Sequence, residues 1–319
     1  MGKILFIGVT CVDVVINVDR LPKTAEDVVV FGQQMTLGGC AFNAFWAARA
    51  AGADAVLLSP VGGGAYGDFV RSNLAAEGVT SLFDRAPGEN GCCYCFVEPG
   101  GERTFIAYHG ADYVHRAEWY EGLDLDGVDA VYVCGLEVEE PTGGVIVDFL
   151  ERRCAPAGVR IFFTPGPRPC ELPRDLLARI LDLRPVLHMN DAEACMLASQ
   201  ECDLDEEDLD GEPLGVGQAA RALFDRTGSL VTVTLGADGC WYEDGRRRGA
   251  VPGVPAQVVD TIGAGDAHIG AAMARLVRGD SLEDALACAN RVASAVVSHA
   301  GAHVETLSSC LGVTEGPSE

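Results

Sequence analysis

The 319-residue sequence is poor in positive charge, with 23 Lys and Arg against 47 Asp and Glu and a formal net charge of −24. A surface of that sign repels nucleic acid and anionic membranes unless basic residues gather in one place. The only tight basic run is 246–248, which we interpret as the solvated loop of a hairpin. We therefore expect no nucleic-acid partner.

Long apolar runs are also missing, because no segment approaches the ~20 apolar residues that a membrane helix needs. The first residues, "MGKILFIGVTCVDVV", resemble a signal peptide but offer no small-residue cleavage site, and Asp13 interrupts the apolar run. We interpret them as a buried first strand. The expectation is a cytoplasmic protein with no membrane partner.

A disulfide framework is not indicated, although the chain has 13 cysteines. The count is odd, the chain is long, and most cysteines lie in apolar runs, as small buried hydrophobes do in a reducing compartment. The cluster "CCYC" at 92–95 lacks a second Cys pair or histidines at the spacing of a zinc site. We interpret it as an ordinary strand whose Cys93 and Cys95 share a face.

What the chain does have is an alternation of short β-branched runs and helix-period segments. Buried parallel strands are predicted at 3–9, 55–61, 130–136, 160–165, 186–190 and 230–236. Helices are predicted at 42–52, 66–78, 143–154, 172–182, 217–228 and 266–279. The alternation predicts a single α/β domain over 1–319, with a doubly wound, mostly parallel central sheet flanked by helices.

Two stretches, 14–37 and 91–112, show strand alternation with turns but no helix between them. They predict a small antiparallel β lid beside the main sheet. The acidic run at 201–212 is predicted to be a solvated loop, and 314–319 a frayed tail.

The stretch "VVDTIGAGDAHIG" at 258–270 places three small residues, Gly263, Ala264 and Gly265, at the predicted start of a helix. Unpaired backbone N–H groups and the helix dipole favour an anion there. Asp266 follows in the first turn. It could merely satisfy the dipole, or it could take a proton from an attacking hydroxyl as a general base. The residues alone leave both interpretations open.

A second glycine pair, Gly38 and Gly39, precedes an amphipathic helix with Asn43 near its start. Glycines permit close approach of the backbone to a ligand, and Asn can bind vicinal hydroxyls. A glycine turn followed by an Asn that caps the helix would explain the same residues. Asp13 follows the first strand, at the edge where α/β folds bind ligands. Sugar hydroxyls or backbone N–H groups could satisfy its charge.

Asn190 and Glu193 have the spacing of a helix capping box, and Glu193 could also hold water on Mg²⁺ beside a triphosphate. The segment "GGGAYG" at 62–67 matches the dinucleotide fingerprint, although it follows the second strand instead of the first. An NAD(P)-dependent oxidoreductase is therefore a more remote alternative. The phosphate-binding P-loop and protein-kinase signatures are absent from the sequence.

Four motifs, "LGGCAFN", "MNDAE", "VTLGADG" and "DTIGAGD", together resemble the ribokinase-like (phosphofructokinase-B type) carbohydrate kinases, over about residues 3–307. The stretch from 166 to 194 looks like a branch of uncharacterised bacterial sugar kinases. The resemblance implies an ATP-dependent kinase that transfers the γ-phosphate to a primary hydroxyl of a sugar or sugar derivative. It also implies that the protein binds ATP, Mg²⁺ and a small-molecule sugar.

The resemblance further implies roles for single residues. Asp266 would be the general base, and the N–H groups of Gly263, Ala264, Gly265 and Asp266 the anion hole. The sugar would contact Asp13, Gly38, Gly39, Asn43 and Glu137, with Arg103 and Arg168 in reach of a polar or acidic sugar group. The nucleotide would contact Asn190, Thr234, Gly236 and Asn290, and Glu193 would hold Mg²⁺ through water.

Members of that family often bind a monovalent cation such as K⁺ beside the anion hole. Asp260 and the carbonyls of Ile262 and Gly301 fit that role, but Glu305 stands where several relatives carry a small hydroxyl residue. Cys11 stands where ribokinase has an Asn that touches ribose, so we do not expect ribose as the substrate.

Other functions stay open. A nucleoside kinase of the same fold would need an apolar base pocket, for which the lid offers Phe96, Phe105 and Tyr108. A catalytically silent sugar sensor is a further alternative, against which the retention of Asp266 argues. The apolar alternation at 91–97 would allow a homodimer through the lid.

Overall fold

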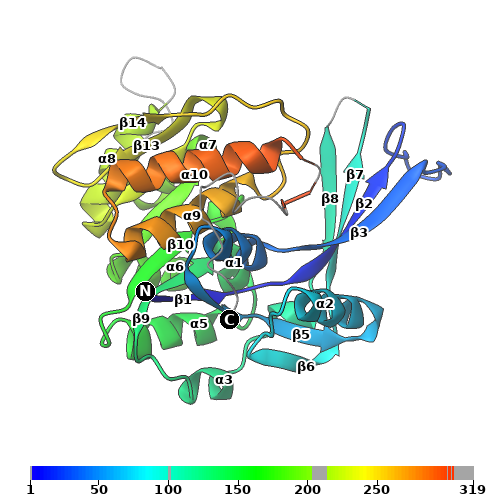
Figure 1. Cartoon of the computed structure of the whole chain (residues 1–319), viewed down its shortest axis with the longest axis horizontal. Helices are drawn as coiled ribbons and strands as arrows, with labels where there is room; N and C mark the ends of the chain where they lie inside the picture. Colours follow the sequence, from blue (N-terminus) through cyan, green and yellow to red (C-terminus); the bar gives the residue numbers. More distant parts are fainter. Residues whose placement is uncertain (1, 100–101, 203–213, 300, 303, 305–319) are drawn as a thin grey trace, which may run out of the picture.

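A mostly parallel sheet of eight strands lies at the centre of the molecule in the computed structural model (Figure 1). Its strands, in spatial order, are β14 (Arg248–Pro252), β13 (Gly239–Glu243), β12 (Val231–Thr234), β11 (Val186–Asn190), β10 (Arg160–Thr164), β9 (Val128–Cys134), β1 (Lys3–Ile7) and β4 (Asp54–Leu58). Two pairings at one edge, β12 with β13 and β13 with β14, are antiparallel, and the other pairings of this sheet are parallel. The structure describes residues 2–99, 102–202, 214–299, 301–302 and 304.

Helices cover both faces of this sheet because its strands alternate large apolar residues between the two sides. Phe162 packs into one core and the next residue, Phe163, into the other. The first face carries α1 (Cys40–Ala50), α9 (Ala264–Arg278) and α10 (Leu282–Val297), which lie in front of the sheet in Figure 1. The second face carries α3 (Ala117–Glu121), α5 (Gly143–Phe149), α6 (Arg174–Asp182), α7 (Asp191–Glu201) and α8 (Val216–Thr227).

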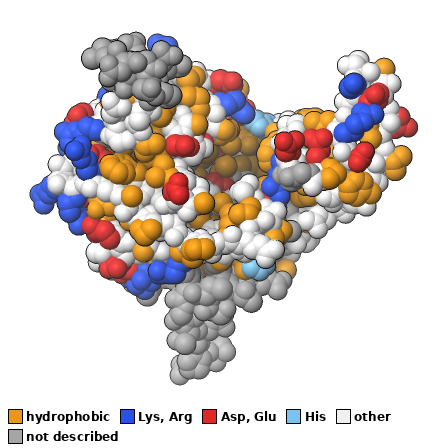
Figure 2. Space-filling model, turned by 90° about the horizontal axis from the view of Figure 1, so that it is seen from above, with side chains coloured by type: hydrophobic (Ala, Val, Ile, Leu, Met, Phe, Trp, Pro, Cys, Tyr) orange, Lys and Arg blue, Asp and Glu red, His pale blue; other side chains and the backbone are white. Residues whose placement is uncertain are grey.

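A separate four-stranded sheet projects from one side of the molecule (Figure 1). It consists of β3 (Gly32–Gly38), β2 (Cys11–Asn17), β7 (Cys92–Val97) and β8 (Arg103–Tyr108), in that order. Two antiparallel pairs, β2–β3 and β7–β8, are joined by a parallel pairing of β2 with β7. We call this sheet the lid. Figure 2 shows that the surface is hollowed between the lid and the main body.

The predicted architecture is confirmed, with some local differences. The run at 55–61 is two strands instead of one: the chain bends after β4, and Pro60 begins β5 (Pro60–Gly63), which pairs with β6 (Phe83–Glu89) and leads into α2 (Gly64–Ala76). The helix predicted at 143–154 is α5 followed by a short π-helix (Leu150–Cys154). The basic run at 246–248 lies at the β13–β14 turn, as predicted. The predicted acidic loop at 201–212 lies almost wholly outside the described residues, and so does the predicted tail.

Two sequence interpretations concern single segments. The "CCYC" cluster is part of β7, and Cys92, Cys93 and Cys95 are free thiols. Within the described part of the chain, no group of three or more metal-ligating side chains is arranged to hold an ion.

A membrane span needs a long apolar helix, and no helix in the described ranges combines that length with that apolarity.

Candidate active site

The N-terminus of α9 is the centre of the site. Gly263 is the N-cap, with a φ of 72°, a left-handed conformation in which a Cβ would come within 2.5 Å of Ala302. The first amides of a helix have no carbonyl partner of their own. Beside Gly265, nothing in the described part of the chain lies within 4 Å of where a Cβ would stand. An anion can therefore approach the backbone of this turn.

Asp266 extends from the first turn of α9 toward α1. Its Oδ2 accepts a hydrogen bond from Nδ2 of Asn43 at 3.0 Å. Burial raises the pKa of Asp266 to about 6, hydrogen bonds from Asn43 and Cys40 oppose the rise, and the charge of Glu193 adds to it. At pH 7 the group is still mainly a carboxylate, and it is a stronger base than an ordinary Asp.

Two glycines directly before α1 allow close packing against the segment that follows β1 and against β2. A Cβ on Gly39 would stand 2.5 Å from the carbonyl oxygen of Val9, and one on Gly38 would stand 2.0 Å from Oδ2 of Asp13. Asn43, in the first turn of α1, is buried, and its Oδ1 has no hydrogen-bond partner among the described residues. A buried amide oxygen of this kind can accept a hydroxyl from a ligand.

Asp13 reaches the site on the lid and not on the main sheet, which corrects the prediction that it directly follows the first strand. The chain turns after β1, and Asp13 is the third residue of β2. Burial raises the pKa of Asp13 to about 6, the thiol of Cys11 opposes the rise, and the charges of Asp266 and Asp260 add to it. Asp13 thus lies on the lid, within range of the charges of Asp266 and Asp260.

Glu137 is the third residue of the short helix α4 (Gly135–Glu139), which directly follows β9. It is fully buried, and its Oε1 accepts the N–H of Val9 at 2.9 Å. Burial raises the pKa of Glu137 to about 8, so the group is mainly a neutral acid at pH 7. Its Oε2 is buried without a partner among the described residues. The neutral acid can donate a hydrogen bond to a bound hydroxyl.

Asp112 is a buried carboxylate of this region that we did not predict from the sequence. Its Oδ1 accepts the N–H groups of Gly91 at 2.6 Å and Gly110 at 3.1 Å, where β7 begins and β8 has ended. Burial raises the pKa of Asp112 to about 6, and its Oδ2 has no partner in the described chain. The local sequence "HGAD" does not indicate a buried carboxylate site, because the N–H groups of Gly91 and Gly110 come together only when the lid is folded. Asp112 thus holds the base of the lid.

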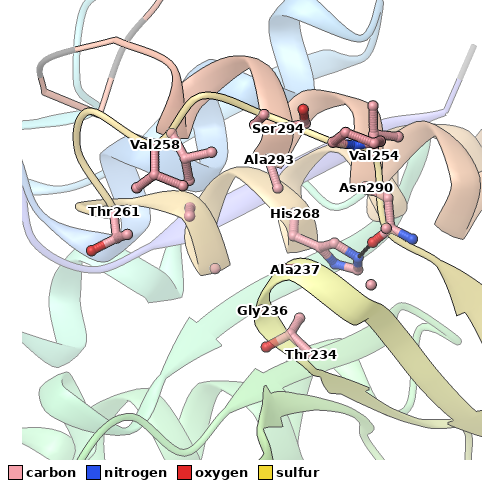
Figure 3. A pocket seen from close by; sticks show the side chains of 17 residues that line it. Thr234, Gly236, Ala237, Val254, Val258, Thr261, His268, Asn290, Ala293 and Ser294 are labelled. Atoms are coloured by element: carbon pink, nitrogen blue, oxygen red, sulfur yellow. Dashed lines mark hydrogen bonds between the residues drawn. The ribbon is translucent and has the colours of Figure 1, made fainter.

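On the other side of the α9 turn lies a pocket of about 400 Å³, within the range of small-molecule sites. Thr234, Gly236 and Asn290, which were predicted to contact the nucleotide, all line it, together with Ala264 and Gly265 of the turn. Figure 3 shows Thr234 and Gly236 on one wall and Asn290 on the facing wall. The structure therefore brings these predicted residues together at the turn.

A chain of buried hydrogen bonds fixes one wall of this pocket. Nδ2 of Asn290 donates to the carbonyls of Val251 and Pro252 at 3.1 and 3.0 Å, so its Oδ1 is the acceptor that faces Nε2 of His268 at 3.1 Å. His268 must then carry its hydrogen on Nε2, and its Nδ1 accepts from Nε2 of His188 at 2.9 Å. Both polar atoms of Asn290 are thereby engaged within the protein, so we assign it to shaping the pocket.

The two histidines were not predicted as site residues. Burial lowers the pKa of His268 to about 4, with the hydrogen bond to Asn290 opposing the change, and burial lowers the pKa of His188 as well. Both rings are therefore neutral at pH 7, as the hydrogen-bond chain requires. A signal was present in the sequence, since His268 comes two residues after Asp266, but its partner His188 is 80 residues away.

The capping box predicted from Asn190 and Glu193 is present at the start of α7. Oδ1 of Asn190 accepts the N–H of Glu193 at 2.8 Å, and Oε2 of Glu193 accepts the N–H of Asn190 at 3.0 Å. The charge of Glu193 also raises the pKa of Asp266.

Two arginines predicted to approach the sugar have carboxylate partners instead. Arg103 pairs with Asp260, Nη2 to Oδ1 at 3.0 Å, inside the protein. Nη2 of Arg168 contacts both carboxylate oxygens of Glu139, at 2.8 and 3.1 Å, and its Nε pairs with Glu171. These charges are matched within the chain, and contact of either guanidinium with a sugar stays a prediction.

The glycines at 62–67 are accounted for by packing. The N–H of Gly62 donates to Oδ1 of Asn90 at 2.9 Å, and a Cβ on Gly62 would meet the backbone of Asn90 at 2.7 Å. A Cβ on Gly67 would stand 2.0 Å from the carbonyl oxygen of Gly62. Close packing of β5 and α2 explains this sequence without a dinucleotide.

Comparison with known proteins agrees with this geometry. The model of the pfkB family of carbohydrate kinases matches residues 1–308. The chain is 35% identical over 299 residues to the uncharacterised sugar kinase YegV of Escherichia coli, covering 94% of this chain and 89% of the relative. The ribokinase of Arabidopsis thaliana, solved with ribose and ATP, has a TM-score of 0.78 at 21% identity, covering 97% of this chain and 98% of the other. A nucleoside kinase of Methanocaldococcus jannaschii has a TM-score of 0.77 at 20% identity, covering 98% of both chains.

Proposed function

Because the chain belongs to the pfkB family of carbohydrate kinases, phosphotransferases with an alcohol as acceptor, we propose that it phosphorylates a primary hydroxyl of a sugar or sugar derivative with ATP. One observation carries this proposal. The pocket lined by Thr234, Gly236 and Asn290 ends at Ala264 and Gly265, and the next residue, Asp266, faces Asn43 on the opposite side of the turn. A nucleotide and an alcohol could therefore meet there.

In this proposal the chain supplies positioning and charge stabilisation, which are what phosphoryl transfer mainly requires. Amides at the start of α9 would bind the transferring phosphoryl group through fixed dipoles. Asp266 would take the proton from the attacking hydroxyl, helped by the pKa that burial raises to about 6. Asp13 and Asn43 would hold neighbouring hydroxyls, and the lid would exclude water from the transfer.

Glu193 fits the role of a residue that holds Mg²⁺ through water. One of its oxygens accepts the N–H of Asn190, and a carboxylate held at the start of α7 could bind the water of a hydrated ion. Mg²⁺ that arrives with ATP would neutralise charge on the phosphates. The capping box fixes the direction of the carboxylate.

The lid indicates a sugar more than a nucleoside. Asp13, Cys93 and Ala107 are cross-strand partners, so they share one lid face, and alternation along β8 adds Phe105 and Arg103 to that face. Of the three aromatic residues offered for a nucleoside base pocket, only Phe105 lies on this face, whereas Phe96 and Tyr108 have the opposite parity and lie on the other face. A nucleoside kinase stays the second candidate because a solved nucleoside kinase shares the fold.

The assembly and location are also part of the proposal. The other lid face exposes Met35, Ile106 and Tyr108, which favours a homodimer through the lid. Size-exclusion chromatography with light scattering would detect it. We place the enzyme in the cytoplasm, where ATP is available and the cysteines of β7 would stay reduced.

The proposal is tested by measuring ADP release from ATP and Mg²⁺ with hexoses, pentoses, sugar acids and nucleosides as acceptors. We expect release with a sugar or sugar derivative. Asp266→Asn should lower kcat by about 10²–10⁴-fold, as loss of a positioned base does, while the enzyme still binds ATP. No release with any acceptor, or a variant as active as the wild type, would refute the proposal. Release with nucleosides alone would favour the second candidate.

A further inference from the structure

We propose that Arg103 is a positioning residue that acts through Asp260: its guanidinium, carried on the lid, supplies the positive charge beside the anion-hole turn, so that the enzyme needs no monovalent cation. This inference rests on the kinase function proposed above and adds the way in which its lid and its anion hole are coupled.

Asp260 ties three parts of the molecule together. Its Oδ1 accepts the N–H of Ile262 at 2.8 Å, just before the N-cap of α9, and its Oδ2 accepts the N–H of Gly301 at 2.9 Å, beyond the end of α10. Nη2 of Arg103 reaches the same Oδ1 from the lid at 3.0 Å. The carboxylate thereby connects the anion-hole turn, the segment after α10 and β8.

The ion pair is buried, with side-chain exposures of 14% for Arg103 and 8% for Asp260. Two charges removed from water in this way are tolerated when they are close together and their remaining polar atoms are hydrogen-bonded. Asp260 meets both conditions, whereas Nε of Arg103 is buried without a partner among the described residues, so this guanidinium depends on Asp260. Removing either partner would leave an uncompensated charge beside the anion hole, whereas an exposed pair would be screened by solvent.

A K⁺ ion does not fit the site that the sequence predicted from Asp260, Ile262 and Gly301. Both oxygens of Asp260 already accept backbone N–H groups, and the charge of its carboxylate is matched by Arg103. A cation added there would lie next to a fixed guanidinium in a region of low exposure, where like charges repel strongly. The predicted cation site and the observed ion pair therefore exclude each other.

The position of Arg103 couples the ion pair to the substrate. Arg103 and Asp13 lie on the same face of the lid, because Asp13 pairs with Cys93, Cys93 pairs with Ala107, and Ala107 is four residues from Arg103 on β8. Bringing Asp13 over a sugar thus also brings Arg103 onto Asp260. We expect the anion-hole turn to be charge-balanced only when the lid covers the site, which would suppress transfer of phosphate to water.

The test compares wild type, Arg103→Met, Arg103→Lys and the control Arg20→Ala, all as full-length protein. Arg20 also belongs to the lid region, in the connection between β2 and β3, and forms an exposed ion pair with Glu26. Rates and melting temperatures are measured in KCl, NaCl and choline chloride at equal ionic strength. For wild type and Arg20→Ala we expect equal rates, within about twofold, and equal Tm in the three salts.

For Arg103→Met we expect kcat/KM to fall by about 10²-fold and ATP hydrolysis without sugar to rise relative to sugar phosphorylation. KCl, or added guanidinium, should restore part of the rate, and KCl should raise Tm by about 2 °C or more over choline chloride. Arg103→Lys should keep more activity than Arg103→Met, since it keeps a charge.

A wild type that K⁺ activates or stabilises would overturn the proposal, and so would an Arg103→Met variant with wild-type rates. If Arg103→Met fails to fold, the salt series on wild type and Arg103→Lys still decides. The Tm comparison needs no substrate. It therefore separates failure of this inference from failure of the kinase function, which would appear as wild-type protein with no turnover in any salt.

Discussion

The two halves of the site differ in how their buried polar groups are satisfied. In the nucleotide half, His188, His268 and Asn290 form a continuous hydrogen-bond chain that ends on backbone carbonyls, and only Nδ1 of His188 at its far end lacks a partner in the described chain. In the sugar half, buried oxygens of Asn43 and Glu137 have no partner among the described residues.

This difference indicates that the nucleotide half is preorganised, whereas the sugar half is completed by its ligand. Buried polar atoms without partners are destabilising, and hydroxyls of a bound sugar would satisfy them. The charge states differ in the same way. In the nucleotide half burial lowers the pKa values of two histidines, and in the sugar half burial raises the pKa values of the acids, so the two halves should respond to pH in opposite directions.

The largest expected effect is on the rate. The pKa of Asp266, raised to about 6, means that the base becomes protonated as pH falls through 6, so kcat/KM should fall up to tenfold per pH unit below that value. A pH series of initial rates from pH 4.5 to 8 measures it. Asp13 has a similar pKa, so Asp13→Asn separates the two groups. A flat profile down to pH 5 in the wild type would remove Asp266 from the role of base.

The next effect concerns the stability of the sugar half. Burial raises the pKa of Glu137 from 4.5 to about 8, so the folded state binds more protons than the unfolded state between those values. The contribution of Glu137 is complete below pH 4.5 and is lost as pH rises through 8. Between pH 5 and 7 the wild type should lose roughly 2.5 kcal/mol relative to Glu137→Gln.

Urea unfolding at the two pH values measures this difference. Gln keeps an oxygen for the N–H of Val9 but cannot ionise, and the exposed Glu118 supplies the matched control, Glu118→Gln. The control should follow the wild type. Parallel pH dependences of wild type and Glu137→Gln would show that Glu137 is ionised in the folded protein.

A slightly smaller effect, of opposite sign, is expected in the nucleotide half. Burial lowers the pKa of His268 to about 4, below its ordinary value of 6.5, so the unfolded state binds more protons between those values. The contribution of His268 is complete above pH 6.5 and is lost as pH falls toward 4. From pH 7 to 5 the wild type should lose roughly 2 kcal/mol relative to His268→Gln.

The same urea series detects it, with the exposed His299→Gln as control. Agreement between the slopes of His268→Gln and wild type would mean that the ring is charged in the folded state, which the hydrogen-bond chain forbids. Together with the Glu137 series, this result would show whether the two halves are opposite in charge state.

The sequence predicted the parts of the site that depend on local patterns. The glycine turn at 263–265, the capping box at 190–193 and the strand ends around Thr234 all follow from neighbouring residues, and the structure places them around one turn. Alternation along β8 could also have shown that Arg103 and Phe105 share a face, whereas Tyr108 does not.

Contacts between distant segments could not be predicted in this way. The pairing of Arg103 with Asp260 depends on where the lid lies over the main sheet, and that of His188 with His268 on how α9 packs on β11. Arg168 looked available for a ligand because Glu139 is 29 residues away in the chain. A charged side chain takes its role from its three-dimensional neighbours, which local sequence does not specify.

The smallest expected effect on stability comes from the anion hole itself. Gly265 lies in the first turn of α9 with open space beside it, so Gly265→Ala should be accommodated and should raise the free energy of unfolding by about 0.5–1 kcal/mol through helix propensity. The added methyl would occupy the space through which an anion approaches, so kcat/KM should fall although stability rises.

Gly144→Ala is the matched control, since Gly144 lies in the first turn of α5 and a Cβ there would have only an ordinary contact, at 3.9 Å. It should gain similar stability and keep its rate. If Gly265→Ala kept the wild-type rate as well, phosphate would not approach the backbone at Gly265, and the preorganised half of the site would lie elsewhere along the pocket.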